Sequence, residues 1–298
     1  MSLLTEVRSL ISRHARQNGL TAPLAGVSLV HADTPTSPSH SLCKPTFALV
    51  VQGAKRTTLG TQIFDYAAGD YLVASVELPI SGYVSRATSH EPYLAMTMAL
   101  EPSSIAALLV DAKIDPRGAD AAAIAINRAP DNLLDAVTRL LRLLDHPEDI
   151  AVMAPMLERE VLWRLLGGEQ GSTVRQIGLA DSHLTQISRA IAWIRDHYAE
   201  PLHSEILGHA SGMSASTLYR HFRAITGMSP LQFQKHIRLQ AARARMLANA
   251  TQVATIGFAV GYESASQFSR EYSRLFGMPP GKDAVRMRAA GDADRAVF

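Results

Sequence analysis

The chain has 298 residues, 47% of them hydrophobic and 19% charged, with a formal net charge of +2. This balance is typical of a globular protein, and the length favours two domains. The sequence has no run of about 18 apolar residues, so it predicts no membrane-spanning helix. The single cysteine, Cys43, excludes an intramolecular disulfide framework and fits a reducing cytoplasm, where we expect the protein to work.

The first hundred residues predict one helix followed by a β-rich domain. The N-terminal stretch MSLLTEVRSLISRHARQNG has an amphipathic pattern with charges throughout, which predicts a short helix and not a targeting segment. From about Thr46 to Leu100, the runs FALVVQG, RTTLG, QIFDYAAGDYLVAS and PYLAMTMAL are short, β-rich and separated by glycine or proline. Such a series predicts a small barrel or sandwich.

Helical patterns return after Pro102. The segments PSSIAALLVDA, DNLLDAVTRLLRLLD and DIAVMAPMLEREVLWRLLGG each carry a wide apolar stripe. Over Pro155–Leu166 there is more apolar surface than one packing face needs, because Trp163 and Leu165 lie on adjacent flanks. We therefore predict a homodimer formed through the helices of residues 130–166.

Two segments near the C-terminus are nearly the same: GMSASTLYRHFRAITGMSP (212–230) and GYESASQFSREYSRLFGMPP (261–280), the second with one extra residue. Their apolar positions are spaced i, i+4, i+7, which predicts a helix with one buried face in each. These positions are Leu218, Phe222 and Ile225 in the first segment and Phe268, Tyr272 and Leu275 in the second.

Each predicted helix is preceded by a shorter one and a glycine turn, which is the helix-turn-helix pattern. A serine stands where an N-cap belongs, a glycine follows where the helix stops, and a small residue would let the two helices cross closely. The matched pairs are Ser214 and Ser264 for the cap, Gly227 and Gly277 for the stop, and Gly208 and Gly257 for the crossing.

The outward faces of the two capped helices are polar and basic. A solvated surface is the ordinary interpretation of one such face, but the duplication favours contacts to base edges and phosphates in a major groove of double-stranded DNA. The candidate DNA-binding residues are Ser216, Thr217, Tyr219, Arg220 and Arg223 in the first helix and Ser266, Gln267, Arg270 and Arg274 in the second.

The segment between the two copies, PLQFQKHIRLQAARARMLAN, predicts a helix of about 18–20 residues, or roughly 27–30 Å. Successive major-groove faces of DNA lie about 34–36 Å apart, so such a helix could hold two reading helices one turn apart.

The distribution of charge along the chain also supports DNA binding. Residues 183–288 hold 13 Lys and Arg against six Asp and Glu, whereas residues 1–182 hold 15 against 19.

On these motifs, the region from about His183 to Arg288 resembles the DNA-binding domain of the AraC/XylS family of bacterial transcription regulators. The resemblance implies two helix-turn-helix units joined by a long helix, with RNA polymerase as a further partner. Glycine stands at positions 208 and 257, where alanine is common in the family, and PPGK closes the second copy in place of serine-proline and an aromatic. The base-reading role falls on Ser216, Tyr219 and Arg220, and on Ser266, Gln267 and Arg270.

The N-terminal stretch QGAKRTTLG…IFDYAAGDYLVASVELPISG also resembles the cupin-like sensor domain of one AraC-type subgroup. The predicted fold class is therefore an N-terminal cupin-like β-barrel with appended helices (α+β) and a C-terminal all-α double helix-turn-helix domain. The predicted boundaries are 1–170 for sensing and dimerisation, 171–182 for a linker, 183–288 for DNA binding and 289–298 for a disordered tail.

A small organic effector in the barrel is expected, although the sequence does not identify it. Aromatic side chains that either line such a pocket or belong to an ordinary core are Phe47, Tyr66, Tyr71 and Tyr83. Cys43 is either a redox or electrophile sensor, with Lys44 lowering its pKa, or a small buried residue.

Two other classes of function stay open: a metal-dependent cupin enzyme fused to a DNA-binding domain, and a ligand-binding barrel whose DNA domain is vestigial. Histidines His31, His40 and His90 form no closely spaced ligand set, and there is no nucleophile elbow, phosphate loop or Cys-x-x-Cys pair. We therefore predict no catalysis, no metal and no cofactor.

Overall fold

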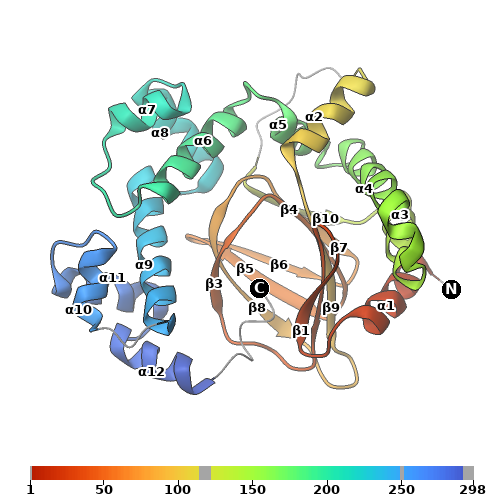
Figure 1. The fold of residues 1–298 in the computed structure, drawn as a ribbon, viewed down its shortest axis with the longest axis horizontal. Helices are drawn as coiled ribbons and strands as arrows, with labels where there is room; N and C mark the ends of the chain where they lie inside the picture. Colours follow the sequence, from red (N-terminus) through yellow and green to blue (C-terminus); the bar gives the residue numbers. More distant parts are fainter. Residues whose placement is uncertain (1, 114–121, 249–251, 291–298) are drawn as a thin grey trace. The chain divides into compact units, whose positions relative to one another are not determined.

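The chain folds into two compact units, Met1–Thr185 and Gln186–Asp294, divided within helix α6 (His183–Asp196). The structure is a computed structural model and describes residues 2–113, 122–248 and 252–290 (Figure 1). Within these ranges, no helix has both the length and the apolar character needed to cross a bilayer. The predicted tail lies outside the described residues from position 291 onward, and α12 (Pro280–Ala290) extends through its first two positions.

The first unit is built on two antiparallel sheets, which form the barrel at the centre of Figure 1. The six-stranded sheet has the order β1 (Gly19–Leu24), β2 (Val27–Ala32), β9 (Tyr93–Ala99), β4 (Thr46–Gln52), β7 (Asp70–Ala74), β10 (Ile124–Arg128). The four-stranded sheet has the order β3 (Ser39–Cys43), β8 (Leu78–Arg86), β5 (Ala54–Leu59), β6 (Gln62–Ala67).

The turn between β4 and β5 requires glycine. Gly53 has φ +78°, and a Cβ at this position would lie 2.5 Å from the carbonyl oxygen of Arg86 and 3.0 Å from Cα of Tyr93. A side chain here would therefore meet backbone from both neighbouring strands.

Register assigns the two faces of the six-stranded sheet. Leu49 pairs with Tyr71 and Phe47 with Val73, so all four side chains share one face. The Tyr71 hydroxyl lies 3.7 Å from the Cβ position of Gly168, directly after α4, so helices cover this face. The opposite face is therefore turned toward the four-stranded sheet and forms the barrel interior.

Helices line the first unit, with α1, α3 and α4 along one side of the barrel (Figure 1). Helix α1 contacts α3 and is joined to it by an ion pair between Arg142 and Glu6 at 2.6 Å, while Arg13 pairs at 2.8 Å with Asp145, in the turn that follows α3. The helices are α1 (Leu3–His14), α2 (Pro102–Asp111), α3 (Asp131–Arg142), α4 (Ile150–Leu166) and α5 (Gly171–Gly178), with 3₁₀ turns at Leu143–Asp145 and Pro147–Asp149.

Helix α5 occupies most of the segment 171–182, for which we predicted a linker. Its residues Val174 and Ile177 are buried, and it packs against α2. Gly178 permits this contact, because a Cβ there would lie 2.7 Å from Cγ2 of Ile105.

The second unit is all-helical, and together with the two-sheet barrel it confirms the predicted fold class. Its hydrophobic core has two parts. Phe222 and Phe233 meet edge to face at 5.4 Å in the first, and Phe268 and Tyr272 at 5.6 Å in the second. Besides α6 and α12, the helices are α7 (Ser204–Ser211), α8 (Ala215–Thr226), α9 (Pro230–Ala248), α10 (Val253–Ala259) and α11 (Ala265–Phe276).

Candidate nucleic-acid interface

The turn between α7 and α8 and the turn between α10 and α11 have the same backbone hydrogen bonds. In the first, the amide of Met213 donates to the carbonyl of Gly208 at 2.9 Å; in the second, Tyr262 donates to Gly257 at 3.1 Å. A left-handed glycine stands in each turn, Gly212 with φ +71° and Gly261 with φ +93°. The sequence repeat is therefore also a structural repeat, with two helix-turn-helix units on the connecting helix α9.

The two small residues at the helix crossings are required by close contacts. A Cβ at Gly208 would lie 2.8 Å from the carbonyl oxygen of Met213, and a Cβ at Gly257 would lie 2.9 Å from the ring of Phe268. Each contact joins the first helix of its unit to the turn or the second helix. Glycine, and not the alanine common in the family, therefore fits this chain.

The second helices of both units start and stop as predicted. The hydroxyl of Ser214 accepts from the amide of Thr217, and that of Ser264 accepts from the amide of Gln267, both at 3.4 Å. Gly227 and Gly277 end the helices in the left-handed conformation, with φ +71° and +76°.

Most of the predicted DNA-binding side chains lie on the open faces of α8 and α11. Tyr219, for example, is 39% exposed, although it is a large aromatic residue. The exposed residues are Ser216, Tyr219, Arg220 and Arg223 on α8 and Ser266, Arg270 and Arg274 on α11. The half-buried ones are Thr217 and Gln267.

Gln267 is held by Glu271, one helical turn later on α11. The Gln267 amide nitrogen donates to Oε1 of Glu271 at 3.3 Å, and Nζ of Lys235 donates to the same oxygen at 2.7 Å. The Tyr262 hydroxyl donates to Oε2 at 2.9 Å. Because a carboxylate only accepts, it turns the NH₂ of Gln267 toward itself and the carbonyl oxygen away.

The charge of Glu271 is stabilised by these partners. Burial opposes its ionisation, but the hydrogen bonds from Lys235 and Tyr262 outweigh that effect and lower the pKa of the carboxyl group. Sequence reasoning missed Glu271, because its role depends on Lys235, which lies 36 positions earlier in α9.

A second carboxylate, Asp283, fixes α12 against the same helices. Its side chain is fully buried, and Oδ2 accepts from Arg243 Nε at 2.9 Å and from the Tyr272 hydroxyl at 2.7 Å. Arg286 donates to Oδ1 at 2.9 Å. Such a buried charge is tolerated because it is multiply hydrogen-bonded.

In the barrel, the four aromatic candidates for an effector pocket are not brought together. Phe47 and Tyr71 lie on the helix-covered face, with ring centroids 5.8 Å apart. Tyr83 pairs in register with Arg56, which carries an ion pair to Asp65 at 2.6 Å. Tyr66 differs from these three, since its hydroxyl lies 3.1 Å from Thr57 Oγ1 and both residues are buried.

Of the four predicted aromatic residues, Tyr66 faces the interior, together with side chains that were not predicted. Lys55 shares its strand face with Thr57, and its Cε lies 3.4 Å from the Cβ position of Gly82. Burial lowers the pKa of Lys55 to about 8. Burial also raises the pKa values of Tyr66 and Cys43. The register between β3, β5, β6 and β8 would have indicated Lys55, Tyr66 and Cys43, but a local sequence pattern does not provide this register.

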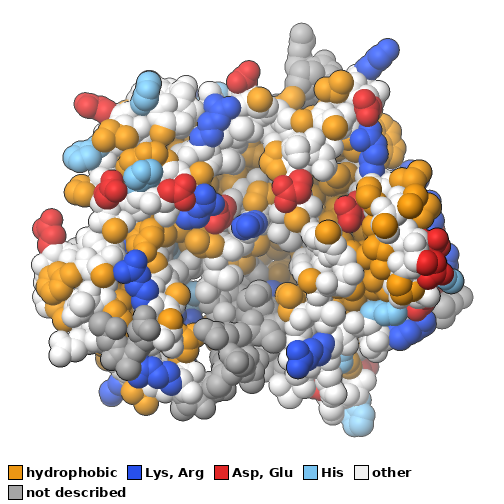
Figure 2. Space-filling model, viewed as in Figure 1, with side chains coloured by type: hydrophobic (Ala, Val, Ile, Leu, Met, Phe, Trp, Pro, Cys, Tyr) orange, Lys and Arg blue, Asp and Glu red, His pale blue; other side chains and the backbone are white. Residues whose placement is uncertain are grey.

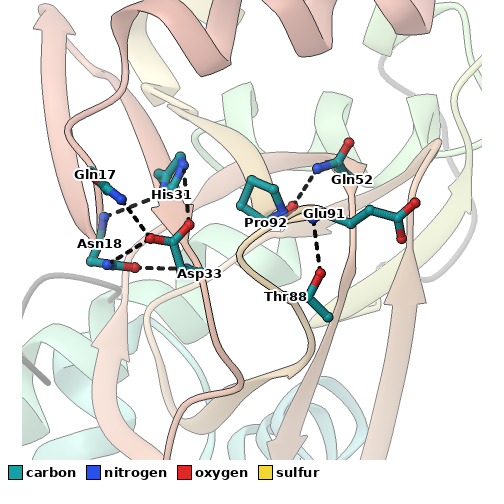
Figure 3. A network of polar contacts seen from close by, with 8 residues as sticks. All are labelled: Gln17, Asn18, His31, Asp33, Gln52, Thr88, Glu91 and Pro92. Carbon is teal, nitrogen blue, oxygen red and sulfur yellow. Dashed lines mark hydrogen bonds and ion pairs between the residues drawn. The ribbon is translucent and has the colours of Figure 1, made fainter.

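His31, a metal candidate considered above, belongs to a network at the start of the barrel (Figure 3). Its Nδ1 accepts from the amide of Asn18 at 3.3 Å, and Asp33 accepts from the side chains of Gln17 and Asn18 at 2.8 and 3.0 Å. These bonds support Asn18, whose φ is +49°. Over the residues that the structure describes, no group of three or more His, Cys, Asp or Glu side chains could hold a metal ion.

Two matched helix-turn-helix units on one connecting helix, following a two-sheet barrel with helices, define a two-domain helix-turn-helix protein with an N-terminal regulatory domain. Known families match both parts. The AraC-type transcriptional regulator N-terminus matches residues 23–173, and a helix-turn-helix domain matches residues 207–284. The chain belongs to the AraC family of transcription regulators.

The individual relatives have low sequence identity to this chain. The chain is 27% identical over 165 residues to the HTH-type transcriptional activator RhaS of Salmonella paratyphi A. The match covers 53% of this chain and 58% of RhaS, so the chain spans little more than half the length of this relative.

Solved structures of ToxT from Vibrio cholerae share the fold. An apo variant matches with a TM-score of 0.56 and 8% identity, over 88% of this chain and 98% of ToxT. ToxT with a bound unsaturated fatty acid matches with a TM-score of 0.53 and 9% identity, over 87% and 94% of the two chains.

Proposed function

We propose that the chain is a sequence-specific transcription regulator that reads two successive major grooves of double-stranded DNA with α8 and α11. The observation that carries this proposal is the structural repeat, with the same turns, caps and stops in both units. The 19 residues of α9 correspond to roughly 28 Å. This length is comparable to the spacing of about 34–36 Å between groove faces.

In this proposal, exposed Arg220 and Arg270 contact base edges and Arg223 contacts phosphate. RNA polymerase is a further candidate partner, since RhaS is named a transcriptional activator. With bacterial DNA as its ligand, the protein works in the cytoplasm and performs no catalysis.

A small organic effector bound in the barrel is the second part of the proposal. Tyr66 and Thr57, with the amine of Lys55, give the interior polar groups that could orient such a molecule. The effector would shift how the DNA-binding domains are held and leave their intrinsic affinity unchanged. A thermal-shift screen of metabolites tests this part: no rise in melting temperature with any of them counts against it.

A homodimer through α3 and α4 is the third part. Val152, Met156 and Trp163 follow one stripe of α4 and are 69%, 61% and 44% exposed. Hydrophobic side chains gather on the surface where these helices lie (Figure 2). Clustered exposed apolar residues are typical of association surfaces.

Gel-shift titration on the protein's own upstream DNA, over a series of salt concentrations, tests the main proposal. We expect specific binding with a steep salt dependence, because several arginines displace counterions from phosphates. A double variant, Arg220→Ala with Arg270→Ala, should retain the weak non-specific binding and lose preference for the site. If the wild-type protein has no affinity for DNA at low salt, the proposal is wrong.

A further inference from the structure

Two arginines on one face of α9, Arg238 and Arg245, join the segment that leads into the first helix-turn-helix unit to the second helix-turn-helix unit. They stand seven residues apart, which is about two helical turns. Each binds a group from residues 198–200 and a carbonyl from residues 259–261. The first segment follows α6 and leads into the first helix-turn-helix unit, and the second runs from the last residue of α10 into the turn of the second helix-turn-helix unit.

Arg238 makes most of this connection. Its Nε donates to the carbonyl of Tyr198 at 2.6 Å, Nη2 to that of Glu200 at 2.9 Å and to that of Ala199 at 3.4 Å. Its Nη1 donates to the carbonyl of Gly261 at 2.8 Å. The rigid planar fork of a guanidinium can satisfy several carbonyls only in one relative position, which a lysine cannot specify.

Arg245 repeats the connection two turns later. Its Nη2 lies 3.0 Å from the Tyr198 hydroxyl and its Nη1 lies 3.4 Å from the carbonyl oxygen of Ala259. The long second distance makes this the weaker of the two connections.

The backbones that Arg238 joins are also in direct contact. A Cβ on Gly261 would lie 2.2 Å from the carbonyl oxygen of Ala199, so the turn of the second unit is pressed against residue 199. The guanidinium therefore binds carbonyl groups on both sides of a backbone contact, and removing it would leave these carbonyls without a shared donor.

We propose that Arg238, supported by Arg245, is a positioning residue that sets the orientation of the second helix-turn-helix unit relative to the first. It thereby determines which spacing between the two half-sites of the DNA the protein accepts. This inference rests on the proposed function, since it concerns how two DNA-reading units are held. Arg238 itself need not touch DNA.

The test is a binding titration on four kinds of duplex: both half-sites at the natural spacing, the same site with one base pair inserted or one removed, and each half-site alone. One base pair turns the second half-site by about 35°. The wild-type protein should therefore bind the two altered sites much more weakly than the natural one.

In Arg238→Lys, we expect binding to the natural site to fall about tenfold, while binding to each single half-site changes by less than about twofold. The loss caused by adding or removing one base pair should shrink to a few-fold, because the two units are no longer held at one angle. A merely destabilised protein would lose binding to single and double sites alike and would keep its spacing preference.

Arg243→Lys is the matched control. Arg243 lies on the same helix, but it binds Asp283 of α12 and lies 5.0 Å from the ring of Phe276 at the end of α11, so it makes neither of the contacts of Arg238. It should keep the wild-type spacing preference. Thermal unfolding by circular dichroism establishes that each variant is folded under the binding conditions.

A wild-type spacing preference in folded Arg238→Lys, or an equal loss on single half-sites, would overturn this inference while leaving the proposed function intact. If the wild-type protein itself binds none of the duplexes, the proposed function fails and this inference fails with it.

Discussion

Arginines in the second unit have two distinct environments, exposed and enclosed. Arg220 and Arg270 are exposed, whereas Arg243 is 17% exposed and paired with a fully buried carboxylate. An exposed guanidinium can bind a base edge bidentately, while an enclosed one is committed to the fold. The residue type alone does not distinguish the two roles.

Replacing Arg220 or Arg270 by alanine should weaken specific binding by about 1–3 kcal/mol and relax base preference in one half of the site. Arg223→Ala should weaken binding to all sequences alike and reduce the salt slope by about one, as expected for a phosphate contact. Selection from a randomised DNA library and titrations at several salt concentrations check both. An unchanged base preference in Arg220→Ala would contradict the groove assignment.

Glu271→Gln should change base preference at one position in the second half-site, by about 1–3 kcal/mol. The carboxylate orients the Gln267 amide, and a neutral amide at 271 both accepts and donates, so either orientation of Gln267 becomes possible. His221→Gln, at the matching position of α8, serves as the control and should leave the second half-site unaffected. The same library selection measures both variants, and an unaltered preference in Glu271→Gln would be inconsistent with the network.

Lys55 predicts a pH dependence of stability. Its pKa is about 8 in the folded chain against an ordinary value of 10.5. Between these pH values the unfolded chain binds more protons than the folded chain, so the free energy of unfolding increases as pH rises. Relative to Lys55→Met, the wild-type free energy of unfolding should rise by about 1–2 kcal/mol from pH 8 to 10.5, allowing for solvent screening.

Urea unfolding of both proteins across this pH range measures the difference. Lys55→Met is itself the matched reference, since Tyr66, whose raised pKa acts in the opposite direction, is present in both chains. A relative fall in wild-type stability would contradict the lowered pKa of Lys55.

At the level of elements, prediction succeeded where periodicity and end signals coincide. Helices α8 and α11 have an i, i+4, i+7 stripe, a serine cap and a glycine stop, and they lie within a residue of the predicted limits. Strand β3 has five half-buried residues without alternation, so no pattern marks it. Strand β10 is short and ends the order of its sheet beside β7, and α5 was obscured because Gly167, Gly168 and Gly171 indicated a helix stop and a linker.

The two left-handed glycines of the second helix-turn-helix unit, Gly261 and Gly277, offer a matched pair of substitutions. Gly261→Ala should destabilise the chain more than Gly277→Ala, although both positions have positive φ. At Gly277 nothing lies within 4 Å of the Cβ position, so only backbone strain of about 1–2 kcal/mol is added. At Gly261 the same strain combines with a collision with the carbonyl of Ala199.

Chemical denaturation of both variants gives the comparison directly. We expect Gly261→Ala to cost at least about 1–3 kcal/mol more than Gly277→Ala, as overpacking against backbone does. Equal losses would show that the contact with Ala199 relaxes without cost.

For the whole molecule, the repeat located the candidate DNA interface, whereas the barrel interior was not predictable. The nine candidate DNA-binding residues follow from helical spacing, and seven of them are exposed. Which strand residues face the interior depends on register between strands distant in sequence. Phe47 and Tyr71 therefore looked equivalent to Tyr66, although they lie on the helix-covered face of the six-stranded sheet and Tyr66 lies on the interior face of the four-stranded sheet.

A charge in the α4 stripe tests the homodimer. Met156→Asp should convert a dimer to a monomer in sedimentation at tens of micromolar, because an unpaired carboxylate would be buried at the interface. Val285→Asp, on α12 and 66% exposed, is the control and should leave the assembly unchanged. A wild-type chain that sediments as a monomer would exclude this surface as a dimer interface.

The connecting helix α9 has one more consequence, for the side of the DNA that stays open. Two reading helices held about one helical turn apart approach the duplex from the same side, so its opposite side is left uncovered along the whole site. Hydroxyl-radical cleavage should then show protection that recurs about every 10 base pairs, with full cleavage half a turn away. Another protein could bind the same stretch of DNA at the same time on the uncovered side of the duplex.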